Sequence, residues 1–577
     1  MISIMTTEAK SFRAFGWVQD SSNFRSLCNV VAVFDFNSAK HKELLEITLP
    51  KLVLKSDGLN NLLEAMNTRP LKIKYNYLVG TSFKPRKISR CNALIQAVVK
   101  GQIRDFIGDW PADNFVRWAH CLGFIKYDYA DDTFSITQTG LELTDAFENT
   151  EELSKKEETI ITNALLAYPP VIRILYLLSK KNAHFTKFEL GKNLGFIGES
   201  GFGSMPQNTL IRELSQINNP KEKNKIKTDW EGASDKYARM IARWLVNLGL
   251  VEQIKKDVFV NVGGNIYSET IGQAYMITTR GITAFNRSLG KSRHAKIKKN
   301  VCYEMFATKG KDREYLRTRR ALIIKILIEK RKAISTSEIE IYLKSNGIKT
   351  TLEAIRDDIL GLNRLGFNIV TDNEKYFCCD KVNDFIIPLV FNITESDIGR
   401  TKDSVRKNIT HISKDYLSLI DLAYDSSQNR LFEMKTLELL TEECGYEGTH
   451  LGGSRKPDGI IYTNTLTKNY GVIIDTKAYA NGYNLPISQA DEMQRYISEN
   501  QRRDKKENPN EWWKNFASNV NIFYFMFVSG HFKGKYQEQI NRIAQITETK
   551  GISIAICDLI LLVDKIKSDG NKYLFIE

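Results

Sequence analysis

The sequence has 577 residues, more than one hydrophobic core accommodates, and this length predicts three or four domains. Hydrophobic residues make up 42% and charged residues 26%, proportions that are ordinary for a globular protein and exclude a fibrous or disordered chain. The formal net charge of +14 favours a polyanionic partner, nucleic acid first.

Several protein classes are disfavoured by missing patterns. The eight cysteines are scattered, without a CxxC pair or a Cys/His zinc spacing, and this predicts buried free thiols in a reducing cytosol. The N-terminus lacks the apolar stretch of a signal peptide, and no apolar run approaches the roughly 18 residues of a membrane helix. Without GxxxxGK[ST] or a DPPY-type motif, neither nucleotide hydrolysis nor DNA methylation is indicated.

Three segments in the N-terminal two thirds of the chain share a similar short sequence pattern. In each copy an amphipathic helix runs into Leu-Gly, where the glycine predicts a helix cap with positive φ, and a hairpin-like stretch follows. This order is typical of the end of a winged helix, so we expect three such domains, mostly α with small β-hairpins. Three unrelated helix-to-strand turns are the alternative. The copies are RWAHCLGFI at 117–125, RWLVNLGLV at 243–251 and LNRLGFNI at 362–369.

Helix-turn-helix entries precede two of these phrases. Thr186 with Glu189, and Ser335 with Glu338, each have the spacing of a capping box at a helix start. A second helix is expected at 352–364, and in such units the second helix enters the major groove of DNA.

These features predict domains at 1–151, 152–298, 299–390 and 391–577. The basic stretch 291–299 would link the second and third domains, and either clamps phosphates or is merely solvated. The polar stretch from about 380 to 410 is expected to be a linker before the last domain.

Two short strands around a polar turn follow at 450–479. Apolar, β-prone runs stand at 460–462 and 472–474. A turn centred near 465–467 would set Asp458 opposite Asp475, and Lys477 shares a strand face with Asp475. Two carboxylates that close need a cation, and hard oxygen ligands suit Mg²⁺, while the lysine orients water or neutralises phosphate charge. A solvated Asp/Lys cluster is the alternative.

The spacing P-D…D-T-K matches the PD-(D/E)xK nuclease motif, and the text around it is more specific. The phrases THLGGSRKPDG, VIIDTKAY, GYNLPI, QADEMQRY, NPNEWWK and FVSGHFKG resemble the cleavage domain of FokI-like type IIS restriction endonucleases. The resemblance implies a C-terminal α/β restriction-endonuclease-like domain with Asp458, Asp475 and Lys477 as catalytic residues. It also implies Mg²⁺ on the two aspartates and cleavage of both strands downstream of an asymmetric site, leaving 5′-phosphate ends.

The resemblance extends into the front half through FGWVQ at 15–19, RWAH at 117–120, LGKNLGF at 190–196, ESGF at 199–202 and WEGASDKYARM at 230–240. It implies base contacts from the first two domains and protein contacts from the third, which hold the nuclease back. The implied DNA-binding residues are Gln19, Arg86, Gln102, Trp110, Glu231, Lys236 and Arg239. Arginine can donate two hydrogen bonds to guanine, glutamine can hydrogen-bond adenine, and glutamate can accept a hydrogen bond from the amino group of cytosine.

For four of these residues a role without base recognition is the alternative. Glu231 would cap a helix, Lys236 and Arg239 would touch only phosphate, and Trp110 would belong to the core. The family has asparagine at the positions of Asp20 and Thr228. The five-base site GGATG is therefore the expected recognition sequence, and these two differences leave a changed sequence as the alternative.

Two helices complete the predicted nuclease domain. Glu433, on a helix at 425–444, either adds an acidic group near the metals or is solvated and paired with Lys435 or Lys477. Asp491 and Arg495, on a helix at 489–502, can pair within it for about 0.3 kcal/mol. The resemblance instead gives them reciprocal salt bridges across a transient homodimer, which one active site per chain requires for a double-strand cut. The strand 523–528 is expected to be buried.

The resemblance further implies a separate methyltransferase that protects host DNA, and the bacterial cytoplasm as location. Two other functions compete with this prediction: a DNA-binding regulator whose nuclease-like domain does not cut, and a structure-specific repair nuclease without fixed sites.

Overall fold

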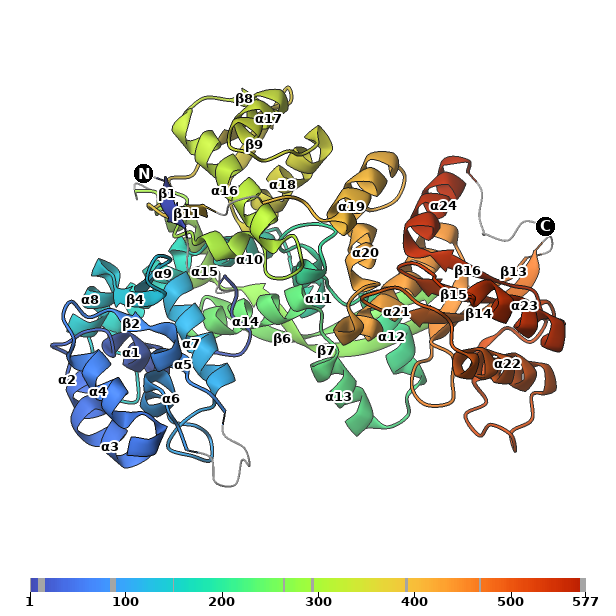
Figure 1. The fold of residues 1–577 in the computed structure, drawn as a ribbon, viewed down its shortest axis with the longest axis horizontal. Helices are drawn as coiled ribbons and strands as arrows, with labels where there is room; N and C mark the ends of the chain where they lie inside the picture. Colours follow the sequence, from blue (N-terminus) through green and yellow to red (C-terminus); the bar gives the residue numbers. More distant parts are fainter. Residues whose placement is uncertain are drawn as a thin grey trace. The chain divides into compact units, whose positions relative to one another are not determined.

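The computed structural model describes residues 2–8, 16–82, 90–148, 150–262, 265–291, 295–389, 393–465 and 468–570 (Figure 1). They form two compact units. Unit 1 comprises residues 1–185, 236–254 and 275–394, and unit 2 comprises residues 186–235, 255–274 and 395–577. The boundary passes through β5 (Phe185–Thr186), α14 (Ala233–Asn247), β6 (Val251–Val262) and β7 (Asn265–Ile277), and these strands form a sheet in the order β5-β7-β6.

Unit 1 is mostly helical. Its first part contains β1 (Ser3–Glu8), α1 (Phe24–Ala32), α2 (Ala39–Glu43), α3 (Leu49–Leu52), α4 (Leu59–Asn67), β2 (Ile73–Lys74), α5 (Tyr75–Val79), α6 (Leu94–Val98), α7 (Asp109–Cys121), β3 (Ile125–Asp128), β4 (Thr133–Ile136) and α8 (Gln138–Asp145). Next come α9 (Lys155–Ala167), α10 (Pro169–Leu178) and α15 (Thr279–Ser288). Its last part contains α16 (Arg313–Glu329), β8 (Ile334–Ser335), α17 (Thr336–Ser345), α18 (Leu352–Leu365), β9 (Ile369–Asp372), β10 (Lys375–Cys378) and β11 (Ile386–Leu389).

The three Leu-Gly phrases end helices as predicted. Helices α7, α14 and α18 stop just before Gly123, Gly249 and Gly366, whose φ angles are +78°, +65° and +121°. Antiparallel hairpins follow the first and third, β3 with β4 and β9 with β10. Each hairpin gains one short strand from upstream, giving the sheets β2-β4-β3 and β8-β10-β9.

Both predicted capping boxes are present. The Thr186 and Ser335 hydroxyls accept hydrogen bonds from the backbone amides of Glu189 and Glu338, and each glutamate side chain accepts from the cap residue's amide. These reciprocal bonds satisfy amides that a helix start leaves without partners. They begin α11 (Lys187–Lys192) and α17, and α18 follows α17 close to the predicted bounds.

Unit 2 is an α/β structure. Besides α11 it contains α12 (Gln207–Gln216), α13 (Pro220–Asp229), α19 (Asp397–Asn408), α20 (Ser418–Leu422), α21 (Asn429–Glu438), β12 (Glu447–His450), β13 (Gly459–Asn464), β14 (Asn469–Lys477), α22 (Ile487–Arg502), β15 (Phe523–Ser529), α23 (Tyr536–Thr547), β16 (Gly551–Ala555) and α24 (Ile556–Ser568). The five strands form one mixed sheet in chain order, antiparallel from β12 to β14 and parallel from β14 to β16.

The sheet of unit 2 is covered on both faces. Ile461 and Val472 face a core that includes residues of α12, α21 and α24, while Ile460 and Ile473 face a second core with α22 and α23. Neighbouring strand residues point to opposite faces, so consecutive apolar residues fill both cores. The predicted strand 523–528 is β15, and its residues from Phe525 to Ser529 are buried.

Two polar stretches are more ordered than predicted. The expected linker at 380–410 contains α19, which Ser396 caps and which buries Val405 against the core. In the basic stretch 291–299, Lys296 pairs with Asp380 at 3.0 Å and Lys299 is buried, so neither is a solvated charge. Arg293 and its two neighbours lie outside the described residues.

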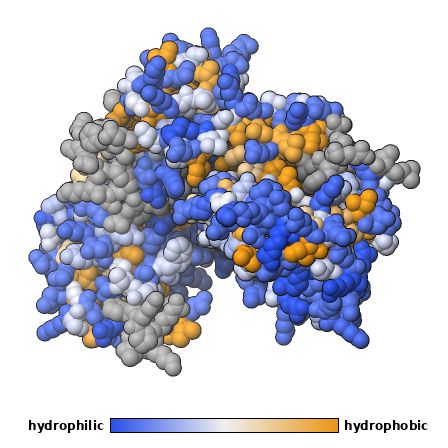
Figure 2. Space-filling view, turned by 45° about the vertical axis from the view of Figure 1, so that its right-hand side comes forward, coloured by the Kyte–Doolittle hydropathy of each residue, from blue (hydrophilic) through white to orange (hydrophobic). Residues whose placement is uncertain are grey.

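The surface and the thiols agree with the composition. The face drawn in Figure 2 is mainly hydrophilic. The eight cysteines, all within the described residues, form no disulfide, and six of them are buried. Within the described ranges no individual helix has the length and apolarity that crossing a membrane requires. Helices α9 and α10 meet these criteria of length and composition only when taken together, and they are bent by 86° with respect to each other.

Candidate functional site

The hairpin of β13 and β14 brings the two predicted carboxylates together. Gly459 pairs with Ile474, so the residues just beyond that pair, Asp458 and Asp475, are opposite each other as predicted. Lys477 ends β14, and its Nζ lies 2.7 Å from Oδ2 of Asp475. The predicted cluster of two acids and one amine is therefore present at the open end of the hairpin.

Backbone and side-chain donors fix the orientation of Asp458. Its Oδ2 accepts hydrogen bonds from the Thr476 amide at 2.7 Å and from the Thr476 hydroxyl at 3.0 Å. Asp475 is only 4% exposed. Because both carboxylates are held by their surroundings, the cluster is arranged before any ligand binds.

The charges in this cluster are strongly coupled. Burial and the Asp458 carboxylate raise the pKa of Asp475 well above its usual range. Burial and the charge of Glu433 raise the pKa of Asp458. Burial alone would lower the pKa of Lys477, but Asp475 and Asp458 outweigh it and raise that pKa. One ammonium does not balance the nearby acids, which leaves a site that favours an added cation.

Glu433 lies beside the cluster on α21, but its partner differs from the predicted ones. Its Oε2 is 2.9 Å from Nε2 of His450, the last residue of β12. Lys435 points elsewhere and pairs with Asp415 at 2.7 Å, so the predicted pairing of Glu433 with Lys435 is wrong. The other His450 nitrogen, Nδ1, is 2.8 Å from Glu213 of α12.

His450 thus bridges two glutamates inside unit 2. Burial alone would lower its pKa, but Glu213 and Glu433 raise it to about 9, so the imidazole is positively charged at neutral pH. His450 belongs to the phrase THLGGSRKPDG but no role was predicted for it, and no role was predicted for Glu213 or Thr476. Thr476 is recognisable from its place between Asp475 and Lys477, whereas Glu213 is far away in the sequence.

The described DNA-binding candidates of the first domain lie at the surface or beside α14. Trp110 starts α7 and is 53% exposed, so it is not a core residue, and its Nε1 donates to Asp20 at 3.1 Å. Gln102 is exposed between α6 and α7. Gln19 is partly buried and hydrogen-bonds Tyr237 of α14. Arg86 lies outside the described residues.

The candidates around α14 differ in their environments. Lys236 and Arg239 lie on α14 and are partly exposed. Glu231 precedes the helix, and its nearly buried carboxylate pairs with Lys187 at 2.7 Å. Thr228, on α13, is exposed and donates to the Asn224 carbonyl at 2.9 Å.

The two dimer candidates on α22 are exposed but do not pair with each other. Asp491 pairs with Arg542 of α23 at 2.9 Å, while Arg495 contacts Glu492 at 3.2 Å and Glu499 at 3.7 Å. The predicted pair within the helix is therefore wrong for this chain. Their side chains are 51% and 41% exposed, which leaves both at the surface of unit 2.

Comparisons with known proteins cover nearly the whole chain. Family models match in four parts: FokI, recognition domain, subdomain 1 at 13–146, and subdomain 2 at 157–293; FokI, D3 domain at 306–374; and FokI, cleavage domain at 395–574. Type II restriction enzyme FokI of Planomicrobium okeanokoites is 44% identical over 562 residues, 96% of each chain. Type II restriction enzyme StsI of Streptococcus sanguinis is 34% identical over 569 residues, 96% of this chain and 93% of its own length.

Solved structures agree. The structure of restriction endonuclease FokI matches with a TM-score of 0.89 and 44% identity, and that of FokI bound to DNA with 0.90 and 43%, each over 97% of both chains. Recognition subdomains joined to an α/β cleavage domain define a type II restriction endonuclease, a DNA-binding enzyme whose cleavage domain implies a divalent metal. The chain belongs to the FokI family.

Proposed function

We propose that this protein is a type IIS restriction endonuclease. It binds an asymmetric double-stranded site, GGATG, and hydrolyses both strands at a distance downstream with Mg²⁺, leaving 5′-phosphate ends. The observation that carries this proposal is the cluster of Asp458, Asp475 and Lys477 at the mouth of the hairpin.

The donor set of this cluster fits Mg²⁺. Asp458 and Asp475 supply hard oxygen ligands that repel one another without a cation. Asp458 and Asp475 would hold the ion, with Glu433 as a further acidic neighbour. When bound, the cation would stabilise charge on the oxygens of the scissile phosphate.

The remaining steps belong to residues of this chain. Thr476 fixes one oxygen of Asp458, so the carboxylate faces the phosphate in one orientation. Lys477, kept protonated by Asp475, orients the attacking water or neutralises phosphate charge. In-line attack then leaves a 3′-hydroxyl and a 5′-phosphate.

Recognition is assigned to separate domains at 1–151 and 152–298, with 299–390 making protein contacts and 391–577 cutting. The short three-stranded sheets beside capped helices support winged-helix domains. Gln19, Arg86, Gln102, Trp110, Glu231, Lys236 and Arg239 contact the site in this proposal. Asp20 accepts from Trp110, so a carboxylate at this position serves as an acceptor for the tryptophan that we place on DNA.

Each chain supplies one cluster and so cuts one strand. A transient homodimer through Asp491 and Arg495 of α22 would therefore cut both strands, and their exposure supports this role. An enzyme of this kind works in the bacterial cytoplasm beside a separate methyltransferase that protects host DNA.

The test is a plasmid that carries GGATG, incubated with wild type or Asp475→Ala in Mg²⁺ and in Ca²⁺. Wild type should give discrete fragments in Mg²⁺ alone, and Asp475→Ala should cut in neither ion yet still shift the DNA on a gel. A shift by wild type without cutting would favour the regulator, while a smear without fixed ends would favour a repair nuclease. Lost binding by Asp475→Ala would refute the division between recognition and cutting.

A further inference from the structure

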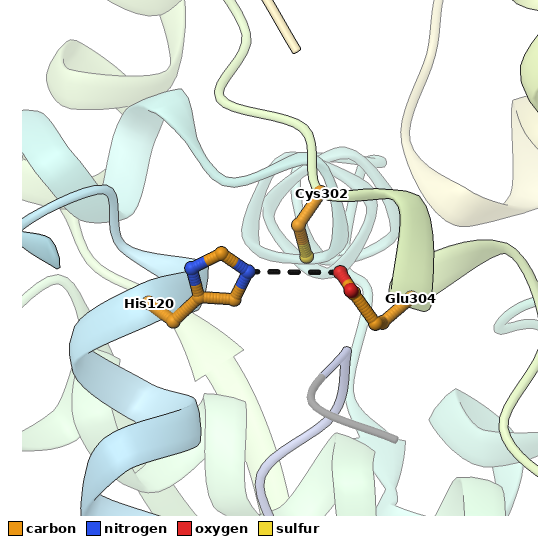
Figure 3. Close-up of side chains that lie close together, drawn as sticks. All are labelled: His120, Cys302 and Glu304. Atoms are coloured by element: carbon orange, nitrogen blue, oxygen red, sulfur yellow. Dashed lines mark ion pairs between the residues drawn. The ribbon is translucent and has the colours of Figure 1, made fainter. Parts of the chain in front are cut away.

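A second cluster of metal-binding residue types lies in unit 1, and its three residues have no role in the proposed binding or cutting of DNA. His120 stands near the end of α7, and Cys302 and Glu304 lie just before α16, yet the three side chains meet (Figure 3). One nitrogen, one sulfur and one carboxylate oxygen all lie within 4.8 Å of one another. The structure therefore gathers three potential ligands from distant parts of the sequence.

Their identity and spacing suit a zinc-type cation. Imidazole nitrogen, thiolate sulfur and carboxylate oxygen are the three donors that Zn²⁺ takes in proteins. His120 Nε2 and Glu304 Oε2 are 3.6 Å apart, longer than the roughly 2.7–3.2 Å of a hydrogen bond. Two such donors on one tetrahedral ion, each about 2.0–2.1 Å from it, are separated by roughly 3.4 Å. The pair is thus spaced more like two ligands than like donor and acceptor.

Hydrogen bonds to neighbouring groups orient the side chains of His120 and Glu304 toward the cluster. The other His120 nitrogen, Nδ1, lies 3.3 Å from the Ile125 carbonyl, an arrangement that leaves Nε2 to face the cluster. The Tyr129 hydroxyl donates to Oε1 of Glu304 and so orients the carboxylate. Glu304 is only 1% exposed, and its other oxygen, Oε2, faces Nε2 of His120 at 3.6 Å. A cation bound by both atoms would lie closer to each of them than they lie to one another.

A metal at this cluster would displace protons from its ligands. Zn²⁺ binds imidazole as the neutral ring and cysteine as the thiolate, so its binding to His120 and Cys302 would release protons, and the anionic ligands Cys302 and Glu304 would offset the charge of the ion.

We propose that His120, Cys302 and Glu304 bind a structural Zn²⁺ ion that joins the end of α7 to the segment before α16. The ion would stabilise unit 1 and take no part in hydrolysis. A metal-free His120–Glu304 ion pair beside a thiol is the competing description.

The test uses the full-length Asp475→Ala protein, which removes a ligand of the proposed nuclease metal. After chelation and dialysis, Co²⁺ is added as the probe. A thiolate ligand produces a sulfur-to-cobalt charge-transfer band, and tetrahedral coordination produces intense visible bands, which the oxygen ligands Asp458 and Asp475 do not give. We expect both signals at about one Co²⁺ per chain, and displacement of Co²⁺ by Zn²⁺.

Two variants in the same background locate the ion. Cys302→Ser should lose the charge-transfer band and the rise in unfolding temperature that Zn²⁺ produces, whereas Cys378→Ser, at a cysteine equally buried at 6%, should keep both. Absence of the band from the parent protein would overturn the proposal, even if Cys302→Ser fails to fold. Equal bands in parent and Cys302→Ser would also overturn it.

Discussion

At the scale of single residues, Asp475 is buried between another carboxylate and an ammonium. Its pKa is raised by burial and by Asp458, so the metal-free fold favours its protonated form. A raised pKa means that the carboxyl stabilises the fold below its ordinary pKa and that this contribution is lost as pH rises through the folded value. As pH rises and Asp475 loses its proton without a metal present, its carboxylate therefore opposes folding until a cation binds.

We predict that Asp475→Asn makes the metal-free protein more stable at pH 8, by about 1 kcal/mol or more, and abolishes cleavage. The advantage should shrink toward pH 4, where the wild-type carboxyl is protonated, and Mg²⁺ should stabilise wild type but not the variant. Thermal unfolding with and without Mg²⁺ measures both effects. If the metal-free variant were less stable than wild type at pH 8, the Asp475 carboxylate would not destabilise the metal-free fold at that pH.

Glu231, proposed to contact DNA, also forms a nearly buried ion pair with Lys187. We predict that Glu231→Ala lowers the free energy of unfolding by about 3 kcal/mol, because Lys187 is left buried without this partner. Glu538→Ala, which removes an exposed pair with Lys535, should cost under about 1 kcal/mol. Chemical unfolding followed by tryptophan fluorescence compares the two. Equal costs would show that the pair of Glu231 with Lys187 contributes no more to stability than an exposed pair.

The sequence predicted the aspartates and the lysine of the site because they are adjacent along one hairpin, where strand register follows from the turn. It did not predict the bridge from Glu433 through His450 to Glu213. That bridge joins α21, β12 and α12, and the packing of separate elements is not encoded in local spacing.

At the scale of elements, α22 presents Arg495 at the surface. We predict that Arg495→Ala lowers the rate of double-strand cleavage at low enzyme concentration and that the rate returns to the wild-type value at high concentration. A weaker dimer still forms when the enzyme concentration is high enough. Arg502→Ala, at the exposed end of the same helix, is the matched control and should behave as wild type. The measurement is the rate of double-strand cleavage against enzyme concentration. An unchanged dependence for Arg495→Ala would rule out its role in dimerisation.

Helix α14 carries the proposed recognition residue Arg239. We predict that Arg239→Ala costs about 1–3 kcal/mol of discrimination at one base pair, because a bidentate contact to guanine is lost. Binding to GGATG and to its five sets of single-base variants measures the loss position by position. A uniform loss across all of these DNAs would make Arg239 a phosphate contact.

Elements with strong local signals were predicted well. The capping boxes and the Leu-Gly helix ends appear where the spacing placed them, since their hydrogen bonds are made within a few residues. Helix α19 was missed because its sequence is mostly polar, and only its packing shows that Val405 is a core residue. The alternative pair of Asp491 with Arg495 within one helix was wrong for the same reason, since Arg542 reaches Asp491 from α23.

At the scale of the whole molecule, family and enzyme class followed from quoted phrases and were confirmed over nearly the full chain. The cysteines were predicted to be buried thiols; in the described residues none forms a disulfide, and all but Cys379 and Cys557 are buried. The sequence also showed no zinc spacing, and the cluster of His120, Cys302 and Glu304 explains why that test was insufficient. Its members are brought together by the packing of distant segments rather than by a short motif.

In our proposal the cluster of Asp458, Asp475 and Lys477 cuts DNA that separate domains have bound. The decisive measurement is to sequence the ends of a Mg²⁺ digest of DNA of known sequence. We expect 5′-phosphate ends at fixed distances to one side of a single asymmetric sequence, GGATG. Ends within the recognised sequence, ends at unrelated positions, or intact DNA would contradict it.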